Sequence, residues 1–263
     1  MQRILLLILL LVPAGILLAQ EEYQWAPPLL EYQTIFFKKE TSVSMKFAQP
    51  GTRIHYTTQQ RKPTASDPAY SKPVAINKRY TKLSAAVFGG SYRASDAVSV
   101  EFIKDGLPFK ANLLTPTNPK YPGTGPNTLH DNLGGITGIS YPGWMGFNND
   151  VVQVQLDLEK KTTVSELLIH TLQAEGSWVF LPSAITVYYI DAVSGAKKVF
   201  GRLEYKAQQE TPGAQCVSQR VRPAQKISTN QLIIEMSVVN SIPDWHPGKG
   251  QQGWLFIDEI KVY

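Results

Sequence analysis

The sequence is poor in cysteine. Cys216 is the only cysteine among 263 residues, so no disulfide can form within the chain. Without covalent cross-links the protein must be held together by apolar cores, and 263 residues suffice for two small cores or one large one.

Motifs for metal binding and catalysis are also scarce. The four histidines, His55, His130, His170 and His246, lie far apart and lack the spacing of zinc ligands. Residues 138–142 approach the motif of a serine nucleophile, but a proline replaces the second glycine. Asp258 and Glu259 are neighbours in an expected strand, where adjacent side chains point to opposite faces. We therefore predict that the protein is not an enzyme.

Positive charge is not concentrated anywhere in the chain. The formal net charge is +5, and the basic residues include scattered pairs: Lys38-Lys39, Arg61-Lys62, Lys160-Lys161 and Lys197-Lys198. A nucleic-acid-binding surface usually needs a concentrated basic stripe. We therefore predict no nucleic-acid partner.

A long apolar run occurs at the N-terminus, at residues 4–18. It follows Arg3, is interrupted by Pro13, and precedes the small residue Ala19. A membrane anchor needs about 20 apolar residues, so the pattern favours a secretory signal peptide over residues 1–19. We expect an exported protein, whether periplasmic, cell-surface or secreted, with no transmembrane segment after signal cleavage.

Sustained helical periodicity is absent, whereas apolar and polar residues alternate with period two in many short segments. Strands are expected at residues 41–47, 53–57, 82–88, 152–158, 164–172, 185–190, 198–203, 232–238 and 255–263. In the last strand, Phe256, Ile260 and Val262 are expected to face a core. The pattern predicts an all-β protein with two β-sandwiches, at residues 20–104 and 110–263. The linker, residues 105–109, is short enough that the sandwiches should pack together.

The first sandwich carries a family resemblance. Residues 54–58, 62–64, 70–73 and 83–90 resemble the chitobiase/β-hexosaminidase C-terminal module, which is similar to a fibronectin type III fold. The resemblance implies a spacer or packing role without chemistry of its own.

The second sandwich resembles another module of the same enzymes. Residues 129–135, 143–147, 154–158 and 245–260 are similar to the discoidin-like (coagulation-factor type C, galactose-binding-like) domain that ends many bacterial β-hexosaminidases. The resemblance implies a jelly-roll β-sandwich. The catalytic α/β barrel of those enzymes has no counterpart in this sequence, which agrees with the prediction of a non-catalytic protein.

The discoidin-like resemblance also implies a structural calcium ion. The positions that match its ligands are Asp131, Thr137 and Glu259, with the carbonyl groups of Leu129 and Gly134. Oxygen ligands of this kind suit calcium. The alternative is that Asp131 caps a turn and Glu259 is a buried hydrogen-bond partner.

Loop aromatics with polar neighbours suggest carbohydrate binding, because sugar C–H faces stack on aromatic rings and sugar hydroxyls bond to polar groups. The predicted contacts are Tyr141, Trp245, His246, Asn148 and Lys249, whereas Trp144, Trp178 and Trp254 are expected to be packing residues. The ligand class is a glycan, with amino-sugar or galactose-containing glycans as candidates. The alternative function is a structural or docking module that buttresses or partners an exported glycoside hydrolase.

Overall fold

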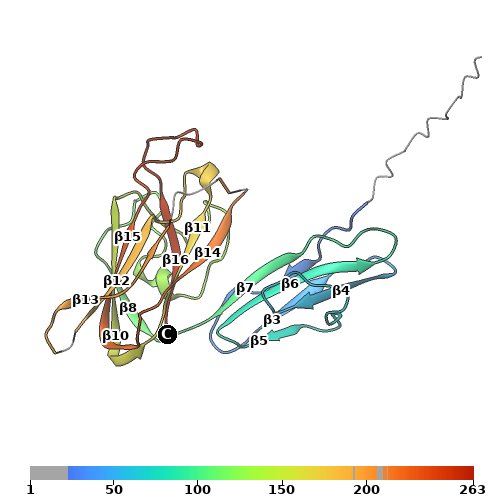
Figure 1. Cartoon of the computed structure of the whole chain (residues 1–263), viewed down its shortest axis with the longest axis horizontal. Helices are drawn as coiled ribbons and strands as arrows, with labels where there is room; N and C mark the ends of the chain where they lie inside the picture. The colour runs from blue at the N-terminus through green and yellow to red at the C-terminus, as the bar shows by residue number, and fades with distance from the viewer. Residues whose placement is uncertain (1–22, 192, 206–209, 212) are drawn as a thin grey trace, which may run out of the picture.

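The computed structural model describes residues 23–191, 193–205, 210–211 and 213–263 as two β-sandwiches that lie side by side (Figure 1). The predicted signal peptide, residues 1–19, falls outside the described residues. Within those residues, no helix is both long and apolar enough to span a membrane. The all-β, two-sandwich fold class is therefore confirmed.

The first sandwich contains two sheets. One has the order β1-β3-β5, and the other the order β2-β7-β6-β4. The strands are β1 (Leu29–Glu31), β2 (Phe36–Phe37), β3 (Thr41–Lys46), β4 (Thr52–Thr57), β5 (Val74–Ile76), β6 (Tyr80–Gly89) and β7 (Val98–Lys104). Alternation decides which side chains face inward: Val43 and Met45 of β3 are buried, as is Leu83 of β6. These residues form a core of their own with Phe37 and Phe102.

The second sandwich packs a five-stranded sheet, β13-β12-β15-β10-β8, on a four-stranded sheet, β14-β11-β16-β9. Its first half contains β8 (Phe109–Leu113), the 3₁₀ helix η1 (Pro126–His130), β9 (Met145–Phe147), β10 (Val151–Val164), β11 (Leu167–Gln173) and the 3₁₀ helix η2 (Glu175–Ser177). Its second half contains β12 (Ala184–Ile190), β13 (Lys197–Glu204), β14 (Gln215–Val221), β15 (Ile227–Ser237) and β16 (Leu255–Val262).

Strict alternation in β10 places the second core. Val152, Val154 and Leu156 are fully buried and face strands of the opposite sheet across one apolar cluster. β10 pairs antiparallel with both β8 and β15, so it lies inside its sheet. Strands β8, β9 and β14 were not expected from the sequence. β14 reads QCVSQRV, in which Gln219 is a buried polar residue whose side chain bonds to Thr171.

The last strand differs from its expected alternation because it carries a β-bulge. β16 pairs with β11 through His170 and Glu259, and then the register shifts so that Thr171 faces Ile257. Ile257, Ile260 and Val262 consequently face the core, whereas Phe256 joins a separate cluster. The expected core face of Phe256, Ile260 and Val262 was therefore wrong for Phe256. A bulge of this kind adds one residue to a strand and reverses the facing of those beyond it.

The same bulge corrects the prediction that Asp258 and Glu259 point to opposite faces. Both carboxyl groups bond to the same loop: Asp258 Oδ2 accepts from the Gly135 N–H at 2.9 Å, and Glu259 Oε2 accepts from the Asn132 N–H at 3.0 Å. Both side chains are completely buried in these contacts. The pair is a structural element of the second sandwich.

The two sandwiches meet through an apolar cluster surrounded by polar contacts. Phe36 and Ile103 of the first sandwich pack on Leu168 and Tyr263 of the second. Around them, Tyr80 and Arg222 bond to Glu166, and Ser218 and Arg220 bond to Glu101. The C-terminus lies at this junction in Figure 1. The expectation that the sandwiches pack together agrees with these contacts.

Removing the Phe36 ring should weaken this junction. Phe36 is completely buried and meets the His170 ring edge-on at 5.0 Å. We expect Phe36→Ala to lower the free energy of unfolding by about 3–5 kcal/mol, since it opens a cavity and removes contacts across the junction. Urea denaturation measures the change. Leu29→Ala, at an exposed residue of β1, should change it by less than about 0.5 kcal/mol, and equal effects of the two substitutions would contradict the prediction.

Candidate functional site

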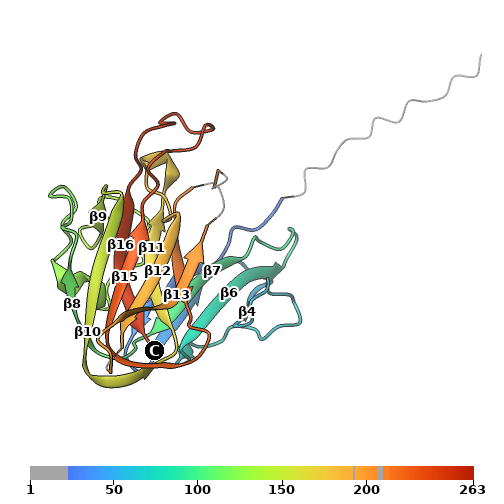
Figure 2. The ribbon, with the colours of Figure 1, turned by 60° about the vertical axis from the view of Figure 1, so that its left-hand side comes forward.

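One end of the second sandwich gathers loops that are far apart in sequence. The loop between β15 and β16 projects from this end beside η2, as both views of the ribbon show (Figures 1 and 2). The segment that contains Tyr121 joins them, because the Tyr121 ring lies 5.4 Å from the Trp254 ring at the start of β16.

Aromatic side chains from these loops line a hollow of about 230 Å³. Its lining includes Tyr121, Trp178, Trp254 and Phe256, with Lys120 at the same site. The Tyr121 ring is tilted against Phe256 at 4.6 Å, and the Lys120 ammonium lies 5.2 Å from the centre of the Tyr121 ring. The hollow therefore combines aromatic faces with a flexible cationic hydrogen-bond donor.

Trp178 owes its position to an unusual backbone conformation. Its φ is 66°, in the left-handed region that non-glycine residues seldom occupy. Two hydrogen bonds of its backbone hold it there: Trp178 N–H donates to the Glu175 carbonyl at 2.7 Å, and the Trp178 carbonyl accepts from Trp254 N–H at 2.8 Å. A further bond, from Phe180 N–H to the Trp254 carbonyl at 2.9 Å, joins the same two segments. Strained residues held by their surroundings are common at binding sites.

His246, a predicted glycan contact, is instead built into the loop. Its ring is buried, with Nε2 2.9 Å from the Glu175 carbonyl oxygen and Nδ1 accepting from the Gly248 N–H at 3.0 Å. These partners fix the tautomer with the proton on Nε2. The ring also meets Trp178 edge-on at 5.9 Å. His246 thereby ties the β15–β16 loop to η2 and packs against Trp178, which lines the hollow.

The other predicted contacts do not form one group. Trp245 is 38% exposed beside His246, and Lys249 is exposed in the same loop. Asn148 accepts a hydrogen bond from Asn118 at 3.1 Å, near the turn that precedes Tyr121. Tyr141 is half-buried against the cluster that contains Trp144 and Phe256. Whether any of these residues contacts a ligand stays a prediction.

The residues that line the hollow were not among the predicted glycan contacts. Trp178 and Trp254 were expected to be packing residues, and both are half-buried, which is compatible with packing and with lining a site. Lys120 and Phe256 were not considered for binding. The sequence signal was present in the neighbouring pair Lys120-Tyr121, but its closeness to Trp254 depends on the fold.

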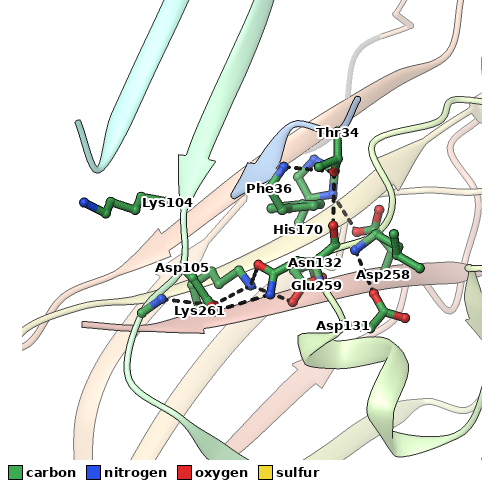
Figure 3. A network of polar contacts seen from close by, with 12 residues as sticks. Thr34, Phe36, Lys104, Asp105, Asp131, Asn132, His170, Asp258, Glu259 and Lys261 are labelled. Atoms are coloured by element: carbon green, nitrogen blue, oxygen red, sulfur yellow. Dashed lines mark hydrogen bonds and ion pairs between the residues drawn. The ribbon is translucent and has the colours of Figure 1, made fainter. Parts of the chain in front are cut away.

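Two of the predicted calcium ligands, Asp131 and Glu259, lie in a network of polar contacts (Figure 3). Glu259 Oε1 accepts from the ammonium of Lys261 at 2.8 Å, while Oε2 accepts from the Asn132 N–H. Asp131 Oδ1 accepts from the Leu133 N–H at 2.8 Å. These contacts match the alternative interpretation, a turn-capping Asp131 and a buried, hydrogen-bonded Glu259.

The remaining ligand positions are spread out. Leu129 is buried in η1, Thr137 lines a cleft between the sandwiches, and Gly134 lies against Asp258, where a Cβ would come within 2.2 Å of Oδ2. Among the residues that the structure describes, no group of three or more His, Cys, Asp or Glu side chains could hold a metal ion. Burial raises the pKa of the Glu259 carboxyl group, and the Lys261 ammonium beside it opposes this shift and favours the carboxylate. The side chains around Glu259 do not fit a calcium ion, because an ammonium already occupies the carboxylate.

The cleft between the sandwiches has a volume of about 290 Å³ and is lined by residues of both, including Glu101, His170 and Cys216. His170 Nδ1 lies 2.6 Å from Oδ1 of Asp258, which is completely buried beside the cleft-lining histidine. Burial raises the pKa of the Cys216 thiol to about 12. Since only the thiolate is a strong nucleophile, Cys216 is not activated for catalysis at neutral pH.

Comparison with known proteins finds one family model that matches part of the chain, within the first sandwich. Residues 34–99 match the chitobiase/beta-hexosaminidase C-terminal domain. This confirms the resemblance predicted for that segment. No curated protein matches the chain.

Solved structures with low similarity include carbohydrate-binding modules. The family 32 module from Streptococcus pneumoniae EndoD is 18% identical, with a TM-score of 0.39, and the match covers 58% of this chain and 94% of that chain. The family 32 module from Clostridium perfringens NanJ, solved with galactose, is 14% identical, with a TM-score of 0.35 and 59% and 92% coverage. A Ruminococcus gnavus GH29 fucosidase is 12% identical, with a TM-score of 0.34; 59% of this chain matches 25% of the fucosidase's length.

The packing beneath Trp178 gives a test of the site. A Cβ at Gly248 would lie 2.7 Å from the Trp178 ring, whereas one at Gly176 would meet nothing within 4 Å. We expect Gly248→Ala to displace the Trp178 ring, change the tryptophan fluorescence spectrum, and destabilise the protein by about 1–3 kcal/mol. Gly176→Ala, the matched control in η2, should leave the spectrum unchanged. An unchanged spectrum in Gly248→Ala would show that Trp178 does not depend on this contact.

Proposed function

We propose that the protein is an exported carbohydrate-binding protein without catalytic activity, and that the hollow at the loop end of its second sandwich holds the glycan. The observation that carries this proposal is the set of aromatic rings around a hollow of about 230 Å³. Aromatic faces stack against the C–H faces of sugars, and binding sites for small molecules are concave and mostly apolar with a few polar groups.

The side chains would have different roles in such a site. Trp178 and Trp254 supply the stacking surface, and the Lys120 ammonium donates hydrogen bonds to sugar hydroxyls. Trp245, which is exposed on the adjoining loop, extends the surface for further sugar units. His246 positions Trp178 without touching the ligand, since both of its ring nitrogens are bonded within the protein.

Several observations support the remaining parts of the proposal. The apolar segment at residues 4–18 supports export. The domain that matches residues 34–99 is named as a C-terminal domain of chitobiase and beta-hexosaminidase. This name supports an accessory role and an amino-sugar glycan as the ligand. A galactose-containing glycan is the other candidate. A single shallow site of this kind binds weakly, so retention on a glycan surface would depend on several sites acting together.

The alternative is a docking module that buttresses or partners an exported glycoside hydrolase. A flat apolar patch would favour a protein partner, whereas a concave set of aromatic and polar residues favours a sugar. The lining of the hollow is of the second kind.

A glycan-array screen of residues 20–263 tests the proposal, with wild type, Trp254→Ala, Lys120→Ala and Trp245→Ala compared at equal concentration. We expect selective binding that falls about tenfold in Trp254→Ala, which corresponds to the loss of ~1.4 kcal/mol of stacking. Lys120→Ala should weaken binding less, because one exposed donor is removed. Trp245→Ala should affect long glycans more than short ones.

The control is Tyr23→Ala, which removes an exposed aromatic ring of the first sandwich. It should bind as wild type does. A thermal melt of each variant confirms that it is folded before the array is read. Absence of binding by folded wild type to every glycan would overturn the proposal and leave the docking role. Equal losses in Tyr23→Ala and Trp254→Ala would show that the hollow is not the site.

A further inference from the structure

A lysine side chain is buried at the junction of the two sandwiches. Lys261 lies in β16, is 1% exposed, and belongs to the outer face of its sheet, where it pairs in register with Leu168. A lysine is almost never fully buried unless its charge is paired. The surroundings of its ammonium group therefore explain why it is there.

Three side-chain oxygens surround the ammonium nitrogen. Lys261 Nζ donates to Glu259 Oε1 at 2.8 Å, to Asn132 Oδ1 at 2.8 Å and to Asp105 Oδ1 at 2.9 Å (Figure 3). An ammonium group has three N–H donors, so each one has an acceptor. The Phe36 ring, 5.5 Å from Nζ, covers the group from the side of the first sandwich.

These three oxygens come from three separate segments. Glu259 belongs to β16, Asn132 to the loop after η1, and Asp105 to the segment between the sandwiches. The loop is shaped for this contact: Asn132 has a φ of 64°, a left-handed conformation that asparagine tolerates better than most residues. The Asn132 carbonyl also accepts from the Thr34 hydroxyl at 3.1 Å. One cation thus joins β16, the loop after η1 and the segment between the sandwiches.

A divalent cation would compete directly with this arrangement. Calcium binds six to eight oxygens at about 2.3–2.6 Å, so an ion on Glu259 would lie a few ångströms from the Lys261 nitrogen. Two positive charges at such a short distance inside a protein repel each other strongly. Both oxygens of Glu259 are also engaged, one by the ammonium and one by the Asn132 N–H.

We propose that the Lys261 ammonium is a built-in cation that takes the place of a metal ion in tying the loop at residues 131–135 to β16. Because Asp105 is its third partner, the same group also fixes the segment between the two sandwiches. The second sandwich is therefore stable without divalent cations, and the lysine cannot leave its site as a bound ion can. This inference is independent of glycan binding.

Calorimetry of wild type tests the inference first. Melting temperatures are compared in excess EDTA and in about 10 mM calcium chloride, which is well above the ~10⁻⁴–10⁻³ M dissociation constants of extracellular calcium modules. We expect the two values to agree within about 1 °C. A calcium site of ordinary affinity would raise the melting temperature in calcium by about 5–10 °C, since binding to the folded state stabilises it. A rise of that size, or one calcium bound per chain in equilibrium dialysis, would overturn the inference.

Substitution of the lysine tests the tie itself. Lys261→Met keeps most of the side-chain length but removes the charge, and leaves the Glu259 carboxylate buried without its cation. We expect a fall in melting temperature of about 10 °C, in keeping with the effect of removing one partner of a buried ion pair. Lys249→Met, at an exposed lysine of the β15–β16 loop, is the matched control and should change it by less than about 1 °C. A Lys261→Met protein that melts as wild type does would refute the tie.

A milder substitution at a partner of Lys261 tests the same contact in case Lys261→Met does not fold. Asp105→Asn keeps an oxygen acceptor near Lys261 and removes one negative charge at a partly exposed position. We expect a smaller fall than in Lys261→Met, about 2–5 °C. No change in Asp105→Asn would show that the segment between the sandwiches does not depend on the ammonium.

Discussion

The buried contact between Lys261 and Glu259 is the interaction on which the arrangement of this protein depends. Neither group is stable in an apolar interior alone, because the desolvation of each charge costs several kcal/mol. Their pairing at 2.8 Å, with both side chains at most 1% exposed, requires the loop of Asn132 and the segment of Asp105 to be in place as well. The charge pair therefore forms only when both sandwiches and the segment between them have assembled.

Strand β16 connects this junction with the candidate binding site. Trp254, directly before the strand, and Phe256, near its start, line the hollow, while Lys261 and the C-terminal Tyr263 lie at the junction. Figure 1 shows the β15–β16 loop and the C-terminus at opposite ends of this strand. The inner face of the strand is held by Ile257, Ile260 and Val262 in the main core. One strand thus runs from the hollow to the junction with the first sandwich.

The fold was predictable where one face of a strand is apolar and the other polar, as in β10 with Val152, Val154 and Leu156. In β16 the alternation of apolar and polar residues predicted the wrong core face. A strict period of two assumes that each residue pairs with one residue of the neighbouring strand, and the β-bulge in β16 breaks this pairing. The pairing of Lys261 with Asp105 and Asn132 joins residues more than 120 positions apart and has no local signal. For the same reason the sequence suggested Trp245 and His246 as ligand contacts but did not reveal that His246 is bonded on both sides.

A polar junction is less stable than an apolar one of the same volume, yet it is more specific. Replacing a buried ion pair by well-packed apolar residues often leaves stability unchanged or improves it. Apolar surfaces, however, can slide over each other with little loss, whereas the Lys261 ammonium finds its three oxygens in one relative position of the sandwiches. Phe36 adds apolar area beside it, and the contacts of Glu101 and Glu166 surround it. The junction therefore gains affinity from its apolar cluster and orientation from its charges.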